Sequence, residues 1–588
     1  MGGNASKSSG GQVTAKKFLN DNGANCVEEM LEGMAKMHPK ELLKIDGMNV
    51  MVRADYEKVK QEHVVLISGG GSGHEPSHAG YCGPGMLTAA VCGNVFASPG
   101  TDAVLNTIRS VTGPKGCLLV VKNYTGDRLN FGLAAEQAKS EGFKVEMVIV
   151  GDDAALSGKG VTGRRGLAGT VLVHKVAGAV AAAGGDLDAV LAAAESVSSA
   201  VRTVGVALST CNVPGKAISD RLVPTDGKME LGLGIHGEPG RETLDLLSTD
   251  ELVRRLSDII MADFQKIDGK KPKRVALVIN NTGGTTPIEI YGICNSALKQ
   301  LADKPFDLTV ERIYAGPIMT SLEMQGFSLS LLALDLDDKL DASKMLAHLD
   351  AETTTLGWPG PVSSFTSEAK VSQPKPVSKP PSNASEAQQS YPTVSSDLAS
   401  TFEKKIRAAA KELIDKEPKL TEWDKICGDG DAGHTFQSGA KMVLEALDAK
   451  QVNLTVPALT AAAMAEQARK MGGTSGAVSS IFFHAVGTSL QHSLDYGAAI
   501  KAGCDAITRY GGAEPGMRTM LDALHAMTEG YVADLSKLAD KSMAAAKSTA
   551  EMNASAGRSN YIPDEKMRGV PDPGAMAVAY AMRALADA

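Results

Sequence analysis

The chain has 588 residues, of which 43% are hydrophobic and only 4% aromatic; this length exceeds a single hydrophobic core and predicts two or more globular units. Its 60 basic and 68 acidic residues give a net charge of −8 without any basic block, which excludes nucleic acid as an expected partner. The eight cysteines form no C-x-x-C pair, and no apolar run reaches the length of a membrane span, so we expect a cytoplasmic protein with reduced thiols.

The first twelve residues, rich in Gly, Ser and Lys, predict a flexible N-terminal tail. The opening letters MGGNAS also fit the pattern M-G-x-x-x-[ST] for myristoylation of Gly2. A single acyl chain gives only marginal membrane binding, and a plain tail is the simpler interpretation.

Residues 13–358 predict an α/β domain. Short apolar runs alternate with helical stretches and favour largely parallel sheets covered by helices on both faces. An N-x-T-G sequence follows a strand at residues 123–126 and again at 280–283, which suggests two α/β subdomains that divide near residue 200. The predicted strands are HVVLIS (63–68), CLLVVK (117–122), KVEMVIV (144–150), KRVALVIN (273–280), DLTVERI (307–313) and LSLLALDL (329–336).

A glycine-rich loop, ISGGGSGHEPSHAG, is expected over residues 67–80. It matches neither G-x-x-x-x-G-K-[ST] nor G-x-G-x-x-G, so it is not a phosphate loop of either known type. We expect its glycines to let a small polar ligand approach the backbone, with His74 and His78 as titrating groups nearby. The alternative is a strand-end loop whose histidines are purely structural.

Two further stretches of this domain carry candidate site residues. Lys122 and Asp127 follow a strand, at the edge where open α/β sheets bind ligands. His236 lies within LGLGIHGEPG, where it could act as a base, ligate a metal or add to a carbonyl carbon. With the glycine loop they predict a pocket for a small hydroxylated molecule, although an ion pair and a turn histidine remain the simpler interpretations.

A Pro/Ser-rich segment over residues 359–395 predicts a linker, because its composition cannot bury enough surface to fold. Beyond it, residues 396–588 predict an all-α domain. In its first helix one apolar stripe is formed by Leu398, Phe402, Ile406, Ala409 and Leu413.

The segment WDKICGDGDAGHT places Asp424, Asp429 and Asp431 among glycines, where their carboxylates can surround one point. Counting from Asp424, an EF-hand requires Glu at position twelve, where this chain has Thr435. The three carboxylates therefore predict a site for Mg²⁺ that is also coordinated by phosphate groups of a ligand. The alternative is that the aspartates only cap helices in a solvated turn. MGGTSGAVSS (471–480) and PGMRTMLDAL (515–524) are each expected to start a helix, a natural anion site.

Taken as a set, eight motifs resemble the ATP-dependent dihydroxyacetone kinases, most closely the triokinase/FMN cyclase type. They occur in the family's order over nearly the whole chain. The motifs are SGGGSGHEPSHAGY, KNYTGD, GLGIHGEPG, D-x₄-D-G-D-x-G, GGTSG, RTMLDAL, GRSNY and DPGA.

The resemblance implies a sugar-binding domain of two α/β subdomains and a nucleotide-binding barrel of antiparallel helices. Catalytic roles fall on His236, which would bind the ketose covalently as a hemiaminal, and on His74 and Asp127 as acid or base. The implied substrate contacts are Gly71, Ser72, Gly73, His74, Lys122, Asp127 and His236; the implied metal ligands are Asp424, Asp429 and Asp431.

The resemblance further implies that ATP binds with Mg²⁺, that dihydroxyacetone and glyceraldehyde are substrates, and that a homodimer brings each helical domain to the other subunit's sugar domain. Some members also cleave FAD to cyclic FMN with Mn²⁺. The implied nucleotide contacts are Ala432, Gly433, His434, Thr435, Thr474, Ser475, Gly511, Thr519, Met520, Arg558, Asp572, Pro573 and Gly574.

This chain departs from the family pattern at three positions, Ala432, His434 and Met517. The family has an acid where this chain has Met517, so Arg518 loses a potential partner beside the nucleotide. ATP affinity is the property that this change affects most. Two alternatives remain. A phosphotransferase-system variant with a bound nucleotide as relay is disfavoured because its two domains are usually separate chains, and a non-enzymatic sugar sensor is disfavoured by the intact His236 and aspartates.

Overall fold

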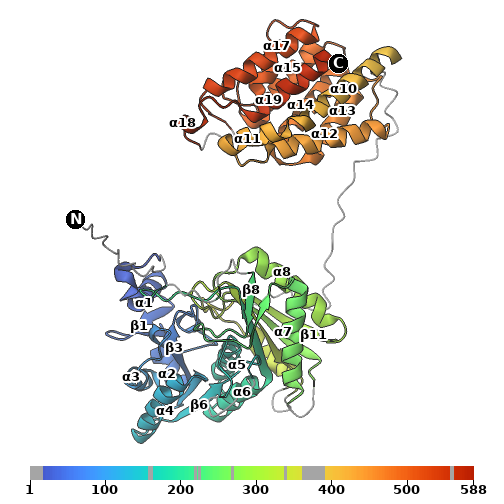
Figure 1. Cartoon of the computed structure of the whole chain (residues 1–588). Coiled ribbons are helices and arrows are strands. Elements are labelled where there is room, and N and C mark those ends of the chain that lie inside the picture. Colours follow the sequence, from blue (N-terminus) through green and yellow to red (C-terminus); the bar gives the residue numbers. More distant parts are fainter. Residues whose placement is uncertain are drawn as a thin grey trace, which may run out of the picture. The chain divides into compact units, whose positions relative to one another are not determined.

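The computed structural model describes residues 17–156, 163–217, 222, 227–266, 271–336, 341–359, 391–556 and 562–588. Gly2, the expected tail and residues 360–390 of the expected linker lie outside the described residues. The chain divides into two compact units, Met1–Gln373 and Pro374–Ala588 (Figure 1), which are described separately below.

The first unit contains two six-stranded sheets. The first has the order β1-β2-β4-β3-β5-β6, in which β3 pairs in parallel with both β4 and β5, and β5 with β6. Its strands are β1 (Leu42–Lys44), β2 (Val50–Arg53), β3 (Val65–Ser72), β4 (Ala89–Val95), β5 (Cys117–Lys122) and β6 (Val145–Val150).

The continuous apolar runs of this sheet arise because both faces are buried. Leu66 and Leu118 belong to one hydrophobic cluster, whereas Ile67 and Leu119 belong to another on the opposite face. Helices cover both sides, α3 and α4 on one and α5 and α6 on the other (Figure 1). The helices of the unit are α1 (Cys26–Met37), α2 (Tyr56–Glu62), α3 (Thr101–Val111), α4 (Thr125–Ser140), α5 (Thr170–Ala182), α6 (Leu187–Ala200), α7 (Thr249–Phe264), α8 (Pro287–Ala302) and α9 (Ala342–Asp350).

The second sheet is mainly antiparallel, so the prediction of largely parallel sheets is wrong here. Its order is β11-β10-β12-β7-β8-β9, and only β10 and β11 pair in parallel. Helices α7 and α8 pack on this sheet, and β7 and β12 are buried along their whole length, which gives antiparallel strands the apolar pattern of parallel ones. Its strands are β7 (Val201–Ala207), β8 (Lys228–Leu231), β9 (Glu242–Asp245), β10 (Arg274–Asn281), β11 (Thr309–Gly316) and β12 (Gly326–Ala333).

The second unit is helical throughout its described residues. Helices α10, α12, α13, α14, α15, α16, α17 and α19 each pack on the next, and α19 closes the ring on α10. The ring surrounds an apolar cavity of about 440 Å³, which is lined by Phe402, Ile406, Ala409 and Leu413 of the predicted stripe, whereas Leu398 is exposed. The helices are α10 (Ser396–Asp415), α11 (Glu417–Cys427), α12 (Ala432–Asp448), α13 (Pro457–Met471), α14 (Gly473–Leu490), α15 (Tyr496–Gly511), α16 (Met520–His525), α17 (Leu535–Ser548), α18 (Asp564–Met567) and α19 (Pro573–Asp587).

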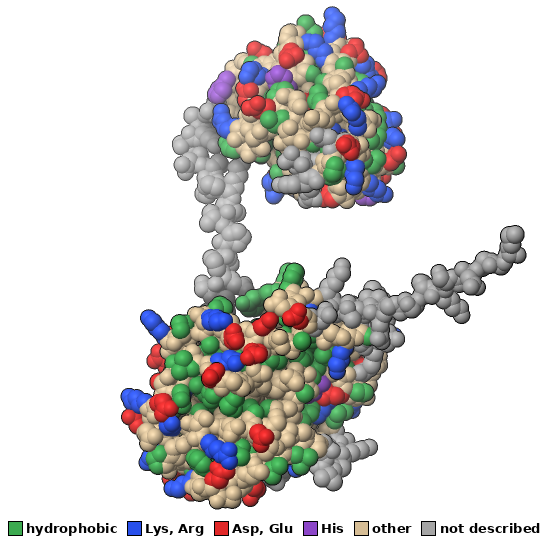
Figure 2. Space-filling model, turned by 90° about the vertical axis from the view of Figure 1, so that its left-hand side faces the viewer, with side chains coloured by type: hydrophobic (Ala, Val, Ile, Leu, Met, Phe, Trp, Pro, Cys, Tyr) green, Lys and Arg blue, Asp and Glu red, His purple; other side chains and the backbone are tan. Residues whose placement is uncertain are grey.

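Charges are mixed over the face shown in Figure 2, where basic and acidic side chains alternate on both units without a continuous basic patch. Among the described residues, no helix is long and apolar enough to cross a bilayer.

Candidate functional site

The first candidate site lies at the carboxyl ends of β3 and β5. The chain leaves β3 for β4 on one side, while β5 pairs with the other side of β3. Ligands of open α/β sheets bind at such a switch point. β3 ends at Ser72, β5 ends at Lys122, and Asp127 follows in the first turn of α4. Three of the predicted sugar contacts therefore share one edge of the sheet.

His74 and His236 face each other through their Nε2 atoms, which lie 3.2 Å apart. His74 is fully buried, and its Nδ1 lies 2.9 Å from the carbonyl oxygen of Thr320, so Nδ1 carries the proton that this bond requires. Burial and the charge of Lys122 hold the pKa of His74 well below its usual value. The ring is therefore neutral, and its Nε2 can accept a proton from a ligand.

Glu238 fixes the other side of the His236 ring. Its Oε1 lies 2.7 Å from His236 Nδ1, and its Oε2 accepts the backbone N–H of His236 at 3.0 Å. Burial would raise the pKa of Glu238, but the hydrogen bond and charge of His236 lower it to about 2. The carboxylate thus keeps a proton on Nδ1 and leaves Nε2 for chemistry. The sequence patterns did not single out Glu238, although a carboxylate two positions after the histidine was a usable signal.

Aromatic rings enclose this histidine pair. Phe96 stacks on His74, with ring centroids 5.1 Å apart, and its edge contacts His236 at the same centroid separation. The ring of Tyr124 lies 4.9 Å from that of His236. The apolar walls leave the two Nε2 atoms and few other polar groups to select a ligand.

Lys122 and Asp127 form the polar part of the same site. Lys122 is 1% exposed, and its Nζ has no hydrogen-bond partner among the described residues. Burial lowers the pKa of Lys122, while the charges of Asp127 and Glu75 act against that shift. Asp127 accepts a hydrogen bond from the Ser98 hydroxyl. A Cβ on Gly70 would lie 3.3 Å from Lys122 Nζ and 3.6 Å from Asp127 Oδ2, so both groups border that glycine and can bind hydroxyl groups together.

The other glycines of the predicted loop serve the packing of the protein itself. Residues up to 72 belong to β3, and a Cβ on Gly69 would lie 2.3 Å from the carbonyl oxygen of Val91. A Cβ on Gly71 or Gly73 would lie 2.9 Å or 2.7 Å from atoms of Phe96. A side chain at any of these three positions would therefore clash with the neighbouring chain, and contact of the Gly71 and Gly73 backbone with a ligand stays a prediction.

His78 takes part in a separate buried contact. Its ring meets that of His174, with centroids 5.1 Å apart, and its Nδ1 lies 3.5 Å from Ser68 Oγ. Burial, with a smaller effect of the Lys122 charge, lowers the pKa of His174 to about 3. Both histidines pack inside the unit as neutral groups.

The second candidate site is the turn between α11 and α12. Carboxylate oxygens of Asp424, Asp429 and Asp431 lie within 4.8 Å of one another, and the described part of the chain holds no other cluster of three or more side chains that could bind a metal. Asp424 is buried and accepts the Ala432 N–H at 2.9 Å, while the other two are exposed. A Cβ on Gly428 would lie 2.4 Å from Asp424 Oδ1, so a side chain there would displace this carboxylate from the cluster. This set of oxygen donors fits Mg²⁺ with positions left for water or phosphate.

Most of the predicted nucleotide contacts lie at the starts of four helices of the second unit. The first N–H groups of a helix have no partner within it and attract anions. Gly511 is instead the last residue of α15, and Arg558 lies outside the described residues. At the helix starts are Ala432, Gly433, His434 and Thr435 on α12, Thr474 and Ser475 on α14, Thr519 and Met520 on α16, and Asp572, Pro573 and Gly574 on α19.

Arg518 is a buried cation behind these helix starts. It is 1% exposed and has a φ of +62°, unusual for a residue with a side chain. Its Nη2 donates to the Cys427 sulfur at 3.1 Å and to the Val570 carbonyl at 2.9 Å, whereas Nε and Nη1 have no partner within the described ranges. Arg518 therefore joins the end of α11 to the segment before Asp572.

Comparisons with known proteins decide the family. The Dak1 domain matches residues 32–357 and the DAK2 domain matches residues 426–587. The chain belongs to the dihydroxyacetone kinase family. It is 37% identical to human triokinase/FMN cyclase over 98% of this chain and 99% of that one, and 46% identical, over 97% and 98%, to a Solanum lycopersicum protein named provisionally as a 3,4-dihydroxy-2-butanone kinase.

The fold agrees with that family. The crystal structure of Citrobacter freundii dihydroxyacetone kinase with AMP-PNP and Mg²⁺ matches with a TM-score of 0.70 and 36% identity, over 98% of this chain and 100% of that one. An α/β unit followed by a helical unit, as predicted from the sequence, is thereby confirmed as the fold class.

Proposed function

We propose that this chain is an ATP-dependent kinase that phosphorylates a hydroxyl group of dihydroxyacetone, and also of glyceraldehyde. The observation that carries the proposal is the facing pair His74 and His236, with Glu238 behind it, at the switch point of an α/β sheet. This pair offers a nucleophile for a carbonyl group. The names of the relatives, dihydroxyacetone kinase and triokinase, support the same substrate class.

In the first step, Glu238 keeps the proton of His236 on Nδ1, so that Nε2 carries a lone pair. This lone pair forms a bond to the carbonyl carbon, and the electron pair of the C=O bond moves to its oxygen. That oxygen takes up a solvent proton, which Nε2 of His74, 3.2 Å from His236 Nε2, can relay, and a hydroxyl on a covalent hemiaminal results. The Glu238 carboxylate faces the imidazolium charge left on His236. Glycerol, which has no carbonyl group, cannot react in this way.

In the second step, the terminal hydroxyl of the bound sugar attacks the γ-phosphate of ATP, and its proton passes to Asp127 or to His74. The bond between the γ-phosphorus and the bridging oxygen breaks, and ADP leaves. Lys122 orients the sugar through its unpartnered ammonium group. Asp424, Asp429 and Asp431 would hold Mg²⁺, which neutralises charge on the β- and γ-phosphates when bound. The N–H groups at the four helix starts bind the nucleotide.

The kinase acts as a homodimer in this proposal, with the helical unit of each subunit serving the α/β unit of the other. The resemblance to the family supports it. A long Pro/Ser-rich segment joins the two units in sequence, which is compatible with such an exchange.

ADP release tests the function. We expect turnover with dihydroxyacetone, glyceraldehyde and 3,4-dihydroxy-2-butanone, and none with glycerol. Equal turnover with glycerol would exclude the covalent step, and no ADP release with any of the carbonyl compounds would exclude the kinase.

A second activity, cleavage of FAD to AMP and cyclic FMN, is favoured by one observation: several mammalian relatives that match nearly the full chain are named triokinase/FMN cyclase. The same nucleotide site would bind the AMP half of FAD, with Mn²⁺ in place of Mg²⁺. Incubation with FAD and Mn²⁺, followed by chromatography for cyclic FMN, tests it. Absence of the product from an active kinase would restrict this chain to phosphorylation.

A further inference from the structure

The loop that carries His236 follows β8 and folds into a closed turn. The Gly234 N–H donates to the carbonyl oxygen of Glu238 at 2.9 Å, and the Gly237 N–H donates to the carbonyl oxygen of Gly234 at the same distance. Ser321 donates its hydroxyl to the carbonyl oxygen of Ile235. Glu238 therefore folds back over the turn and holds His236 by two of its atoms. Ser321 anchors the middle of the turn, and a second anchor fixes its start.

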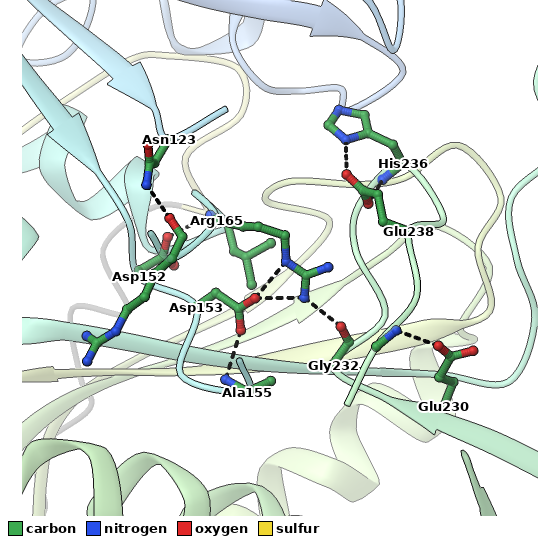
Figure 3. Close-up of polar contacts among 12 residues, drawn as sticks. Asn123, Asp152, Asp153, Ala155, Arg165, Glu230, Gly232, His236 and Glu238 are labelled. Atoms are coloured by element: carbon green, nitrogen blue, oxygen red, sulfur yellow. Dashed lines mark hydrogen bonds and ion pairs between the residues drawn. The ribbon is translucent and has the colours of Figure 1, made fainter. Parts of the chain in front are cut away.

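Arg165 supplies that anchor (Figure 3). Its Nη2 donates to the carbonyl oxygen of Gly232 at 2.6 Å, at the start of the turn. A Cβ on Gly234 would lie 2.7 Å from Arg165 Nη1 and 1.8 Å from Glu238 Oε2. The guanidinium and the Glu238 carboxylate thus border the same glycine, and the positive group lies beside the carboxylate that fixes the histidine.

Asp153 in turn fixes Arg165. Its Oδ2 accepts from both Nε and Nη2 of Arg165 at 2.7 Å, and its Oδ1 accepts the Ala155 N–H at 2.9 Å. Asp153 is fully buried, and the arginine side chain is only 13% exposed. Burial alone would lower the pKa of Arg165, but the Asp153 charge raises it, with a smaller effect of Glu238, so the guanidinium stays charged. Because Asp153 holds the Arg165 guanidinium in one orientation, the guanidinium in turn fixes the position of the turn.

We propose that Arg165, held by Asp153, is a positioning residue for His236. It fixes the 232–238 turn and keeps the Glu238 carboxylate in place, so that His236 stays protonated on Nδ1 and presents Nε2 to the substrate carbonyl. The inference rests on the proposed function for its kinetic consequence, whereas its consequence for the His236 tautomer does not.

Three variants and a matched control test it. Arg165→Met removes the charge and the hydrogen bonds. Arg165→Lys keeps the charge but cannot contact Asp153 through two nitrogen atoms, and Asp153→Asn removes the carboxylate that pairs with Arg165. The control is the adjacent Arg164→Met. Arg164 pairs with Asp263, which keeps Arg202 as a partner at 2.7 Å. Arg164→Met therefore removes an equal charge one position away without touching the His236 turn.

The first measurement is the ¹⁵N NMR spectrum of histidine-labelled protein, with the His236 signals assigned by their loss in His236→Gln. We expect the Nδ1-protonated form in the wild type and in Arg164→Met, and a mixture of tautomers in Arg165→Met and Asp153→Asn. This readout needs no turnover, so it separates failure of the inference from failure of the proposed kinase activity. A single, unchanged tautomer in folded Arg165→Met would overturn the inference.

The second measurement is kinetic. We expect Arg165→Met to raise the KM for dihydroxyacetone by at least about tenfold with the KM for ATP within about twofold of the wild type, because only the ketose depends on His236. Arg165→Lys should recover part of that loss. If Arg165→Met does not fold, Arg165→Lys and Asp153→Asn decide the question, and wild-type ketose KM and tautomer in both would refute the role of Arg165.

Discussion

The Nε2 atoms of His74 and His236 lie 3.2 Å apart, although 162 positions separate the two residues in the chain. His74 comes from the segment after β3 of the first sheet, and His236 from the turn after β8 of the second. The Nδ1 atoms already have partners, His74 with Thr320 and His236 with Glu238, so the two Nε2 atoms remain to face each other. The reactive pair therefore arises where the segments that follow β3 and β8 meet.

Replacement of His236 should affect the ketose alone. In His236→Ala we expect no covalent dihydroxyacetone adduct by intact-mass analysis, a large rise in the KM for dihydroxyacetone and an unchanged affinity for ATP, because the nucleotide contacts belong to the other unit. His525→Ala, which removes a histidine from the helical unit, is the control and should form the adduct. An adduct of wild-type abundance in His236→Ala would rule out His236 as the nucleophile.

Glu238 should stabilise the folded state in a pH-dependent way. Its folded pKa of about 2 lies below the ordinary value of 4.5, so its contribution is fully present above pH 4.5 and is lost as the pH falls toward 2. We expect Glu238→Gln to unfold at a lower temperature than the wild type at pH 7, with a difference that shrinks below pH 4.5. Calorimetry at several pH values measures it. Glu136→Gln, which removes an exposed partner of Lys139, should change stability by less than about 1 kcal/mol at any pH. A Glu238→Gln difference independent of pH would contradict the assignment.

Asp572 should have the opposite effect. Burial raises the pKa of Asp572 to about 6; the charge of Arg518 opposes this shift, and the charges of Asp522 and Asp424 add to it. Ionisation of Asp572 therefore lowers the stability of the folded state in full above pH 6, and this loss of stability disappears as the pH falls toward 3.8. Its Oδ1 caps α19 by accepting the Ala575 N–H at 2.7 Å, a role that Asn fills equally well. We expect Asp572→Asn to be more stable than the wild type at pH 8 by on the order of 1 kcal/mol, and equal to it at pH 4. Denaturant titration at both pH values decides; a less stable variant at pH 8 would show that the charge is compensated.

Exchange of helical units between subunits predicts complementation. His236→Ala and Asp429→Asn should each have strongly reduced kinase activity alone, yet their heterodimer should be more active than either, because one subunit keeps an intact α/β unit and the other an intact helical unit. Two tags on the two variants allow the heterodimer to be purified and assayed. An inactive heterodimer would place both halves of the site within one subunit.

Local patterns were sufficient to predict some elements of the fold. The run CLLVVK is β5 with the predicted bounds, and the apolar stripe of residues 402–413 faces the interior of the helical ring. The order of the eight motifs along the chain was sufficient to predict the family as well. Strand direction was not predictable in the second sheet, because burial of both faces gives antiparallel strands the same continuous apolar pattern.

Contacts between distant segments were not visible in the sequence. Glu238 could have been suspected from its spacing to His236, but nothing local connects Arg165 to the same turn, since Arg165 and Gly232 are 67 positions apart in the sequence. The packing of the glycines at positions 69, 71 and 73 was not predictable for a similar reason. Whether a glycine leaves room for a ligand or for the chain itself depends on the neighbour that arrives, here Val91 and Phe96.

The three aspartates of the second unit should bind Mg²⁺ and nucleotide cooperatively. Carboxylates of Asp424, Asp429 and Asp431 within 4.8 Å repel one another, and the phosphates of ATP add oxygen ligands that Mg²⁺ prefers. ATP should therefore tighten Mg²⁺ binding, and Mg²⁺ should tighten ATP binding by the same factor. Calorimetric titration of Mg²⁺ with and without a non-hydrolysable ATP analogue measures that factor. Equal affinity in both titrations would mean that these aspartates only cap the turn between α11 and α12.

Loss of a single carboxylate should then slow the reaction. Asp429→Asn removes one charge at nearly constant shape, and we expect kcat to fall at least about tenfold, or roughly 1.4 kcal/mol of transition-state stabilisation. Asp505→Asn is the matched control, since it removes an exposed carboxylate that pairs with Lys501 on α15. The dihydroxyacetone adduct should still form in both variants, because His236 belongs to the other unit. Full kinase activity in Asp429→Asn would exclude this residue as a metal ligand, whereas loss of the adduct would show that the change acts on the sugar site instead.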